Sequence, residues 1–158
     1  MSADLRVRPL AEADIPALDD LGHRAPGLWA HRLDEQSRYI SLTLVASIGP
    51  NPIGHAVLTW EGPRGTPDIS DVWVVPSHRR QGVARFLIES CESVARDQGM
   101  TRVGLSVGVE NHAAQALYSS LGYLETPDPP FEESGEWTDA GGIVRAWSEW
   151  VRYRVKSL

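Results

Sequence analysis

A basic loop that ends in glycine lies between two regular patterns in the middle of the chain. A strand-like run ends at Val75, and a helical pattern begins at Gly82. The N-terminus of a helix presents unpaired N–H groups and the positive end of the helix dipole, and both suit a phosphate group. Four basic side chains gather here in an acidic chain: His78, Arg79, Arg80 and Arg85. The pattern predicts an anion-binding site, and the alternative is a loop glycine beside solvated arginines.

Two motifs in this half of the chain resemble those of the GNAT superfamily of acetyl-CoA-dependent N-acetyltransferases. Residues 74–84 read V-x-P-x-x-R-x-x-G-x-A and resemble the acetyl-CoA motif R/Q-x-x-G-x-G/A. The residues on its defining positions are Arg79, Gly82 and Ala84. Residues 111–123 read N-x-x-A-x-x-L-Y-x-x-L-G-Y and resemble the next motif of that superfamily. The segments before Val45 and after Glu125 carry no specific resemblance.

The resemblance implies that acetyl-CoA is the co-substrate and that the loop with Arg79 holds it. Backbone amides would bind the pyrophosphate along one continuous segment: Arg80, Gln81, Gly82, Val83, Ala84 and Arg85. The end of the preceding strand, at Trp73 and Val74, would pair with the pantetheine arm as another strand would. The same resemblance implies that the two central parallel strands splay apart to admit this arm.

Tyr118 and Asn111 share one face of a predicted helix, since they are seven residues apart. Attack of an amine on a thioester requires a neutral amine, a donor for the developing oxyanion and a proton for the departing thiolate. The resemblance implies that Tyr118 reaches the thioester sulfur as the acid and that Asn111 contacts the pantetheine arm. Alternatively, Tyr118 only packs beside Leu117 and Leu121, and Asn111 is a helix N-cap.

The base that takes the proton of the amine is less well defined by the sequence. Asp68 and Asp71 lie on the strand before the glycine loop, near where GNAT relatives carry an acidic group. Strand alternation places the two side chains on opposite faces. Asp71 is the candidate base, and a chain of water molecules without a dedicated base is the alternative.

Other chemistries fit the sequence less well. Residues 104–108 match G-x-S-x-G, but Ser106 falls within a predicted strand and not on the sharp turn that a hydrolase nucleophile requires. The histidines show no metal-ligand spacing such as H-E-x-x-H, so no metal is expected. Cys91 lies on the apolar stripe of a predicted helix, where it is expected as a small buried hydrophobe.

Composition limits the class of protein. The 158 residues are about the length of one domain. A formal net charge of −6 argues against a nucleic-acid partner. A single cysteine excludes an intramolecular disulfide, and no apolar run approaches the roughly 20 residues that span a bilayer. We expect one N-acetyltransferase domain over residues 1–158, located in the cytoplasm, with no membrane or nucleic-acid partner.

Periodicity predicts the secondary structure. Strands are expected at residues 5–9, 42–48, 53–60, 68–75, 102–107 and 143–155, the last of them at a sheet edge. Helices are expected from about residue 14, and at residues 82–98 and 111–120. We interpret residues 22–41 as irregular helix and loop, and the acid-rich residues 126–142 as a loop. This order predicts a mixed α/β domain with a parallel central pair, in agreement with a GNAT-like acyl-CoA N-acyltransferase fold.

The predicted activity is acetyl transfer from acetyl-CoA to a primary amine by direct attack in a ternary complex. A run of acidic residues favours a small cationic acceptor: Asp128, Glu132, Glu133, Glu136 and Asp139. A protein N-terminus or lysine is the alternative acceptor. A non-catalytic acetyl-CoA sensor or interaction domain is the alternative of another class. The sequence does not define the oligomeric state, for which a homodimer is one option.

Overall fold

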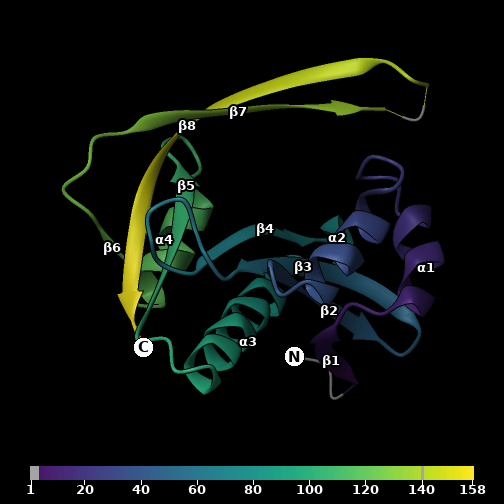
Figure 1. The fold of residues 1–158 in the computed structure, drawn as a ribbon, viewed down its shortest axis with the longest axis horizontal. Helices are drawn as coiled ribbons and strands as arrows, with labels where there is room; N and C mark the ends of the chain where they lie inside the picture. The colour runs from purple at the N-terminus through teal and green to yellow at the C-terminus, as the bar shows by residue number, and fades with distance from the viewer. Residues whose placement is uncertain (1–3, 140) are drawn as a thin grey trace.

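The computed structural model describes residues 4–139 and 141–158, which form one mixed sheet with helices on both faces (Figure 1). The strands are β1 (Leu5–Pro9), β2 (Ser41–Ile48), β3 (Asn51–Thr59), β4 (Asp68–Val74), β5 (Arg102–Gly108), β6 (Leu124–Glu125), β7 (Phe131–Thr138) and β8 (Val144–Ser157). The α-helices are α1 (Ile15–Asp20), α2 (Leu28–Ser37), α3 (Val83–Asp97) and α4 (His112–Ser120), with short 3₁₀ turns η1 (Glu12–Asp14) and η2 (Pro76–His78). The strand order is β1-β2-β3-β4-β5-β8-β6, and β7 pairs with β8.

The helix α3 covers one face of the sheet, and α1 and α2 cover the other. Strand alternation on β2 shows this division. Leu44 and Ala46 belong to the core cluster under α3, whereas Val45 between them packs with Leu18 and Trp29 from α1 and α2. The core therefore has three layers, with helices on both faces of the mixed sheet.

The central parallel pair, β4 and β5, supports the expected opening in the sheet. Its ladder has a single register pair, Asp68 with Gly104, whereas β5 pairs with β8 along its full length. Beyond Asp68 the two parallel strands have no further register pair, so their carboxyl ends separate. The predicted parallel pair is confirmed.

A bulge interrupts β4 in the middle. Trp73 pairs with His55 and Ser70 pairs with Val57, so Asp71 and the residue after it stand opposite a single residue of β3. Asp71 has φ of 50°, outside the extended region. One extra residue reverses the alternation that follows it, which explains why the residues on either side, Ile69 and Val74, both enter the same core.

The bulge also corrects one expectation about the site. A regular strand would place Asp68 and Asp71 on opposite faces because they are three residues apart. With the extra residue between them, both carboxylates belong to the face opposite α3. Alternation could not reveal this, because Val72, Trp73 and Val74 are all apolar and hide the change of phase after the bulge.

Residues 126–142, expected as a loop, contain β7, so this prediction was wrong. The strand pairs with β8 along its full length, starting with Phe131 opposite Val151. The inner positions of β7 are Phe131, Glu133, Gly135 and Trp137. Only half of these are apolar, so pairing with β8, and not hydrophobic alternation, specifies the strand. Residue 140 of the expected loop lies outside the described residues.

Two smaller corrections concern the ends of the sheet and the segment after α1. The last strand, β8, is not an edge: residues 144–151 pair with β7, and residues 151–157 pair with β5. Its C-terminal part also pairs with β6. The segment expected as irregular, residues 22–41, contains the regular helix α2.

Candidate active site

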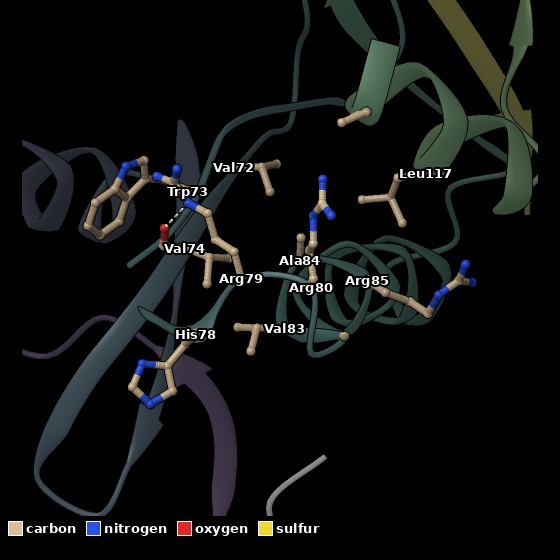
Figure 2. Close-up of a pocket in the computed structure, with 12 residues that line it drawn as sticks. Val72, Trp73, Val74, His78, Arg79, Arg80, Val83, Ala84, Arg85 and Leu117 are labelled. Carbon is tan, nitrogen blue, oxygen red and sulfur yellow. Dashed lines mark hydrogen bonds between the residues drawn. The ribbon is translucent and has the colours of Figure 1, made fainter. Parts of the chain in front are cut away.

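A cavity of about 500 Å³ lies where β4 ends and α3 begins (Figure 2). Its lining residues are Val72, Trp73, Val74, His78, Arg79, Arg80, Gly82, Val83, Ala84, Arg85, Ala113 and Leu117. This cavity, the cofactor cavity, brings together most of the residues expected from the sequence to hold acetyl-CoA. The remaining three, Gln81, Asn111 and Tyr118, are not among the residues that line it.

The loop before α3 leaves the first turn of the helix open. Gly82 is the N-cap residue, with φ of 85°, and it offers no side chain to the N–H groups of that turn. Arg80 has φ of 60°, a conformation that is costly for a residue with a side chain. Arg79 donates a hydrogen bond from Nε to the carbonyl oxygen of Val74, over 2.8 Å, and so ties the loop to β4. The open N–H groups and the arginines are chemically suited to an anion.

The helix α4 supplies the other wall of the cofactor cavity through Ala113 and Leu117. Asn111 is its N-cap, because Oδ1 accepts a hydrogen bond from the backbone N–H of Ala114 over 3.2 Å. Tyr118 is half-buried, and its ring meets that of Tyr123 edge-on. Among the described residues, no hydrogen bond to the Tyr118 hydroxyl is found. Burial raises the pKa of Tyr118, so the phenol keeps its proton, as an acid must.

A second cavity, of about 410 Å³, opens on the face of β4 away from α3. We call it the acceptor cavity; its lining residues are His23, Arg24, Ala25, Asp71, Trp137 and Trp147. Asp71 lines this cavity and the next residue, Val72, lines the cofactor cavity. The two cavities therefore lie on either side of β4 at its bulge.

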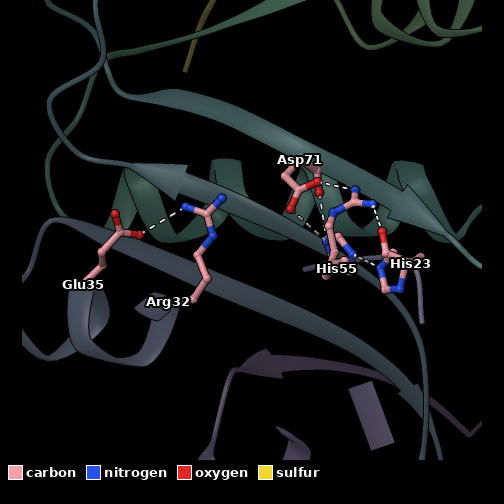
Figure 3. A network of polar contacts seen from close by, with 6 residues as sticks. His23, Arg32, Glu35, His55 and Asp71 are labelled. Carbon is pink, nitrogen blue, oxygen red and sulfur yellow. Dashed lines mark hydrogen bonds and ion pairs between the residues drawn. The ribbon is translucent and has the colours of Figure 1, made fainter. Parts of the chain in front are cut away.

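A polar network surrounds Asp71 (Figure 3). Arg24 donates from Nη2 to Oδ1 of Asp71 over 2.5 Å, and from Nη1 to the carbonyl oxygen of His23. His55 lies on β3, with Nδ1 3.0 Å from the carbonyl oxygen of Asp71. Burial would raise the pKa of Asp71, but the hydrogen bond from Arg24 and the nearby positive charges outweigh it and hold the pKa below its ordinary value. Asp71 is therefore ionised and a weak base.

The two histidines of this network are neutral, and their partners define the tautomers. Burial, with the charge of Arg24 as a further cause, lowers the pKa of both His23 and His55 to about 4. His55 Nδ1 donates to the Asp71 carbonyl oxygen, so its Nε2 carries the lone pair. That atom accepts from Nε2 of His23 over 2.8 Å. The Nδ1 atom of His23 is left as an acceptor, buried and without a partner among the described residues.

Asp68 is a second unusual carboxylate on the same face of β4. Its Oδ1 atom is buried and has no hydrogen-bond partner within residues 4–139 and 141–158. Burial, and then the negative charge of Glu133 on β7, raise the pKa of Asp68 to about 7. A carboxylate with a pKa near neutrality can take up and release a proton under physiological conditions, as a general base must.

Several other groups carry no reactive role. Cys91 is fully buried on α3, and burial raises the pKa of its thiol to about 12. Ser106 lies in the middle of β5, as expected. In the described part of the chain, no group of three or more His, Cys, Asp and Glu side chains could hold a metal ion. None of the described helices is long and apolar enough to cross a membrane.

Comparison with known proteins gives the family. The chain matches the Acetyltransferase (GNAT) family over residues 8–123. It belongs to the GNAT acetyltransferase family. N-acetyltransferase 8 of Homo sapiens is 42% identical over 55 residues, which are 35% of this chain and 24% of the relative. The ribosomal protein bS18-alanine N-acetyltransferase of Salmonella typhimurium is 29% identical over 122 residues, 73% of this chain and 78% of the relative. This GNAT chain spans about a quarter to a half of the length of the first three curated relatives that it matches.

Solved GNAT structures share the fold. The yncA protein of Salmonella typhimurium, solved with its cofactor acetyl-CoA, has a TM-score of 0.72 at 20% identity, over 99% of this chain and 95% of that one. Mutant forms of the spermidine/spermine N-acetyltransferase SpeG of Vibrio cholerae give a TM-score of 0.71 at 17% identity, with the same coverage. The GNAT resemblance and the mixed α/β fold predicted from the sequence are confirmed.

Sequence reasoning did not find most of the acceptor cavity of this GNAT protein. His23 and Arg24 fall in a segment without regular periodicity, and Trp137 falls in the segment expected as a loop. From the sequence we expect the tryptophans mainly to pack and one or two of them to line a substrate groove, without identifying which; Trp137 and Trp147 line this cavity. A local signal does exist in one place: an exposed tryptophan in an acidic strand has no packing role and so indicates a binding surface.

Proposed function

We propose that this protein transfers an acetyl group from acetyl-CoA to the primary amine of a small cationic acceptor, by direct attack in a ternary complex. The observation that carries the proposal is the junction at Asp71 and Val72, where consecutive residues line two different cavities. A donor in one cavity and an acceptor in the other would meet at the bulge of β4. Such positioning removes much of the entropic barrier to a reaction between two molecules.

The residues of the cofactor cavity fit acetyl-CoA. The open first turn of α3 suits the pyrophosphate, and the left-handed Gly82 keeps side chains away from its N–H groups. Trp73 and Val74 line the cavity at the end of β4, where β5 no longer pairs with it. The backbone edge that β5 leaves unpaired there, where Arg79 occupies the Val74 carbonyl oxygen, supports the proposal that the pantetheine arm pairs with it. When bound, acetyl-CoA supplies the thioester that the amine attacks.

Three side chains of this chain are proposed to move protons or to hold the acceptor. Tyr118 gives its proton to the departing thiolate, since its raised pKa keeps the phenol protonated. Asp68 lines neither cavity, but its pKa of about 7 makes it the stronger base of the two β4 carboxylates, and we propose that it receives the proton of the amine through a chain of water molecules. Asp71, the base expected from the sequence, lies in the acceptor cavity, and its ion pair with Arg24 supports the alternative role of holding the cavity wall.

The charge of the acceptor follows from its surroundings. The protein carries a formal net charge of −6, and Glu133 is near enough to Asp68 to raise the pKa of that carboxyl, which favours a cationic acceptor over an anionic one. Relatives whose names give small amine acceptors include an aminoglycoside N(6')-acetyltransferase and a thialysine N-epsilon-acetyltransferase. A protein N-terminus is the second candidate, favoured by the bS18-alanine relative.

A screen of CoA release from acetyl-CoA tests the proposal. The protein is incubated with small monoamines, diamines, amino acids and peptides, and each acetylated product is identified by mass spectrometry. Acetylation of free small amines is the expected result. Acetylation of peptides alone would replace it with the second candidate. Binding of acetyl-CoA without acetylation of any acceptor would support the non-catalytic alternative.

A further inference from the structure

The β7–β8 hairpin turns two tryptophans towards the body of the protein. In Figure 1 the hairpin crosses the molecule and reaches towards the segment between α1 and α2. Trp137 and Trp147 line the acceptor cavity together with His23 and Arg24 from that segment. Both belong to the inner face of the hairpin, because Trp147 stands opposite Gly135, two residues before Trp137 on β7.

These side chains leave large aromatic surfaces uncovered. Trp137 is 44% exposed and Trp147 is 46% exposed, whereas Trp29 in the core is 1% exposed. Neither hairpin tryptophan belongs to the described core clusters. Their rings are therefore available to a ligand in the cavity and do not serve to hold the fold together.

The ring of Trp147 lies against the backbone of a glycine. A Cβ atom on Gly135 would come within 2.8 Å of Nε1 of Trp147 and within 3.0 Å of Cε2 and Cζ2. The indole therefore lies directly over the backbone of β7, in space that any other residue would fill. Gly135 thus leaves the room that Trp147 occupies beside the acceptor cavity.

The positive charges near the two rings are already neutralised. Arg24 is paired with Asp71, and Arg145, which stands opposite Trp137, donates to Asp139 over 3.0 Å. On the same face, Glu133 lies close enough to Asp68 to raise the pKa of that carboxyl. An aromatic surface whose neighbouring arginines are paired can attract a cation, because the face of an indole is electron-rich.

The cation held there cannot be the nitrogen that reacts. An amine attacks a thioester only in its neutral form, so the reacting nitrogen must lose its charge at the bulge of β4. We propose that Trp137 and Trp147 bind a second, unreactive ammonium group of the acceptor. The preferred acceptor is then a diamine or oligoamine and not a monoamine. This inference rests on the proposed function, which it makes more specific.

The test compares α,ω-diaminoalkanes with monoalkylamines of the same chain length in the CoA-release assay. The wild-type protein is expected to show kcat/KM about tenfold or more higher for the best diamine than for its matched monoamine. Trp137→Leu and Trp147→Leu keep an apolar side chain but remove the aromatic face. Each is expected to abolish most of the diamine preference by raising KM, with a small effect on the monoamine.

Trp150→Leu is the matched control. Trp150 lies on β8 opposite Glu132, on the outer face of the same hairpin, and is 55% exposed. Its replacement is expected to leave the diamine preference unchanged. Equal kcat/KM for diamines and monoamines in the wild type would overturn the inference, as would an equal loss of preference in all three variants.

A binding measurement separates this inference from the proposed reaction. Calorimetric titration of the best-binding diamine into the protein with CoA reports the acceptor cavity without turnover. Binding that is lost in Trp137→Leu but kept in Trp150→Leu would support the inference even if no acetylation occurred. Acetylation of monoamines and diamines alike, with the same diamine affinity in all variants, would uphold the reaction and overturn the inference.

Discussion

The imidazole of His23 stacks on the indole of Trp73, with ring centroids 3.7 Å apart and ring planes inclined by 15°. His23 lines the acceptor cavity and Trp73 lines the cofactor cavity. The stack is thus a direct contact between the walls of the two cavities. His55 extends it, with its ring 5.1 Å from that of His23 and 5.6 Å from that of Trp73.

The first prediction follows from this contact. Trp73→Leu is expected to raise KM for acetyl-CoA and for the acceptor together, because the loss of the indole removes support from His23. In a double-mutant cycle with His23→Ala, the two effects on kcat/KM should be coupled by about 0.5–1.5 kcal/mol, the range for an aromatic pair. Trp60→Leu is the control, since Trp60 lines neither cavity. Strictly additive effects of the Trp73 and His23 substitutions on kcat/KM would show that the stack does not couple the two cavities.

The second prediction concerns the glycine at the start of α3. Acetyl-CoA at about 100 times Kd should stabilise the wild type by roughly 2.7 kcal/mol, or about 5–10 °C in Tm. Gly82→Val is expected to remove most of this shift. The valine side chain would be forced into a left-handed conformation and would obstruct the open first turn of the helix.

Gly99→Val is the matched control for that measurement. Gly99 follows the same helix and has φ of 81°, and at both Gly99 and Gly82 a Cβ atom would meet no other atom within 4 Å. Both variants should therefore lose stability by backbone strain, but only Gly82→Val should lose the shift caused by acetyl-CoA. If acetyl-CoA raised the Tm of both variants by the same amount, the first turn of α3 would not belong to the binding site.

The third prediction concerns Tyr118. Tyr118→Phe should lower kcat by about 10²–10⁴-fold, the usual effect of losing a positioned acid, with little change in acetyl-CoA affinity. Its hydroxyl makes no hydrogen bond within the described residues, so the variant should fold with nearly unchanged Tm. A donor with a better leaving thiol should partly restore the rate. A kcat within about threefold of wild type, with chemistry rate-limiting, would leave Tyr118 as a packing residue.

The sequence predicts the cofactor cavity far better than the acceptor cavity, and the reason is distance along the chain. The basic loop and Gly82 are consecutive with the helix that they open, so their spacing alone predicts the anion site. The acceptor cavity joins residues 23–25, residue 71 and two positions of the hairpin. No local sequence pattern predicts that these residues lie together, because strand pairing and the bulge at Asp71 bring them into one cavity.

The fold shows the same contrast. Strands β2 and β3 and helix α3 each bury a continuous apolar face, so their periodicity is clear in the sequence. Strand β7 turns Glu133 and Gly135 to its inner face, because that face lines a cavity and supports a tryptophan ring. A charged residue and a glycine interrupt the hydrophobic alternation there, and a prediction based on alternation must miss the strand.

The fourth prediction is a pH dependence of stability from His55. Burial lowers its pKa from 6.5 to about 4, so the unfolded chain binds more protons than the folded one between these values. The stability contributed by neutral His55 is complete above pH 6.5 and is lost as the pH falls towards 4. His55→Asn retains a donor for the Asp71 carbonyl oxygen and cannot ionise. Its Tm should therefore fall less steeply over this window, whereas the exposed His112→Asn should follow the wild type.

The fifth prediction tests Asp68 as the base. Its pKa of about 7 predicts a limb in the pH profile of kcat/KM, with activity falling about tenfold per unit below pH 7. Asp68→Asn should abolish this limb and lower kcat by about 10²-fold or more. Asp71→Asn should keep the limb and mainly raise KM for the acceptor, because it frees Arg24 from its ion pair. A limb that disappears in Asp71→Asn and persists in Asp68→Asn would assign the proton transfer to Asp71.

Stability gives an independent check on the same carboxyl. Because its folded pKa lies above the unfolded value of 3.8, Asp68 favours the folded state at low pH and opposes it as the pH rises towards 7. Asp68→Asn cannot ionise, so its Tm relative to wild type should rise between pH 4 and pH 8. The stability contributed by Asp68 falls as the pH rises, whereas the stability contributed by His55 rises, so the Asp68→Asn and His55→Asn variants separate the two effects. A Tm difference that does not change with pH would mean that Asp68 titrates near its ordinary pKa and cannot produce the limb near pH 7.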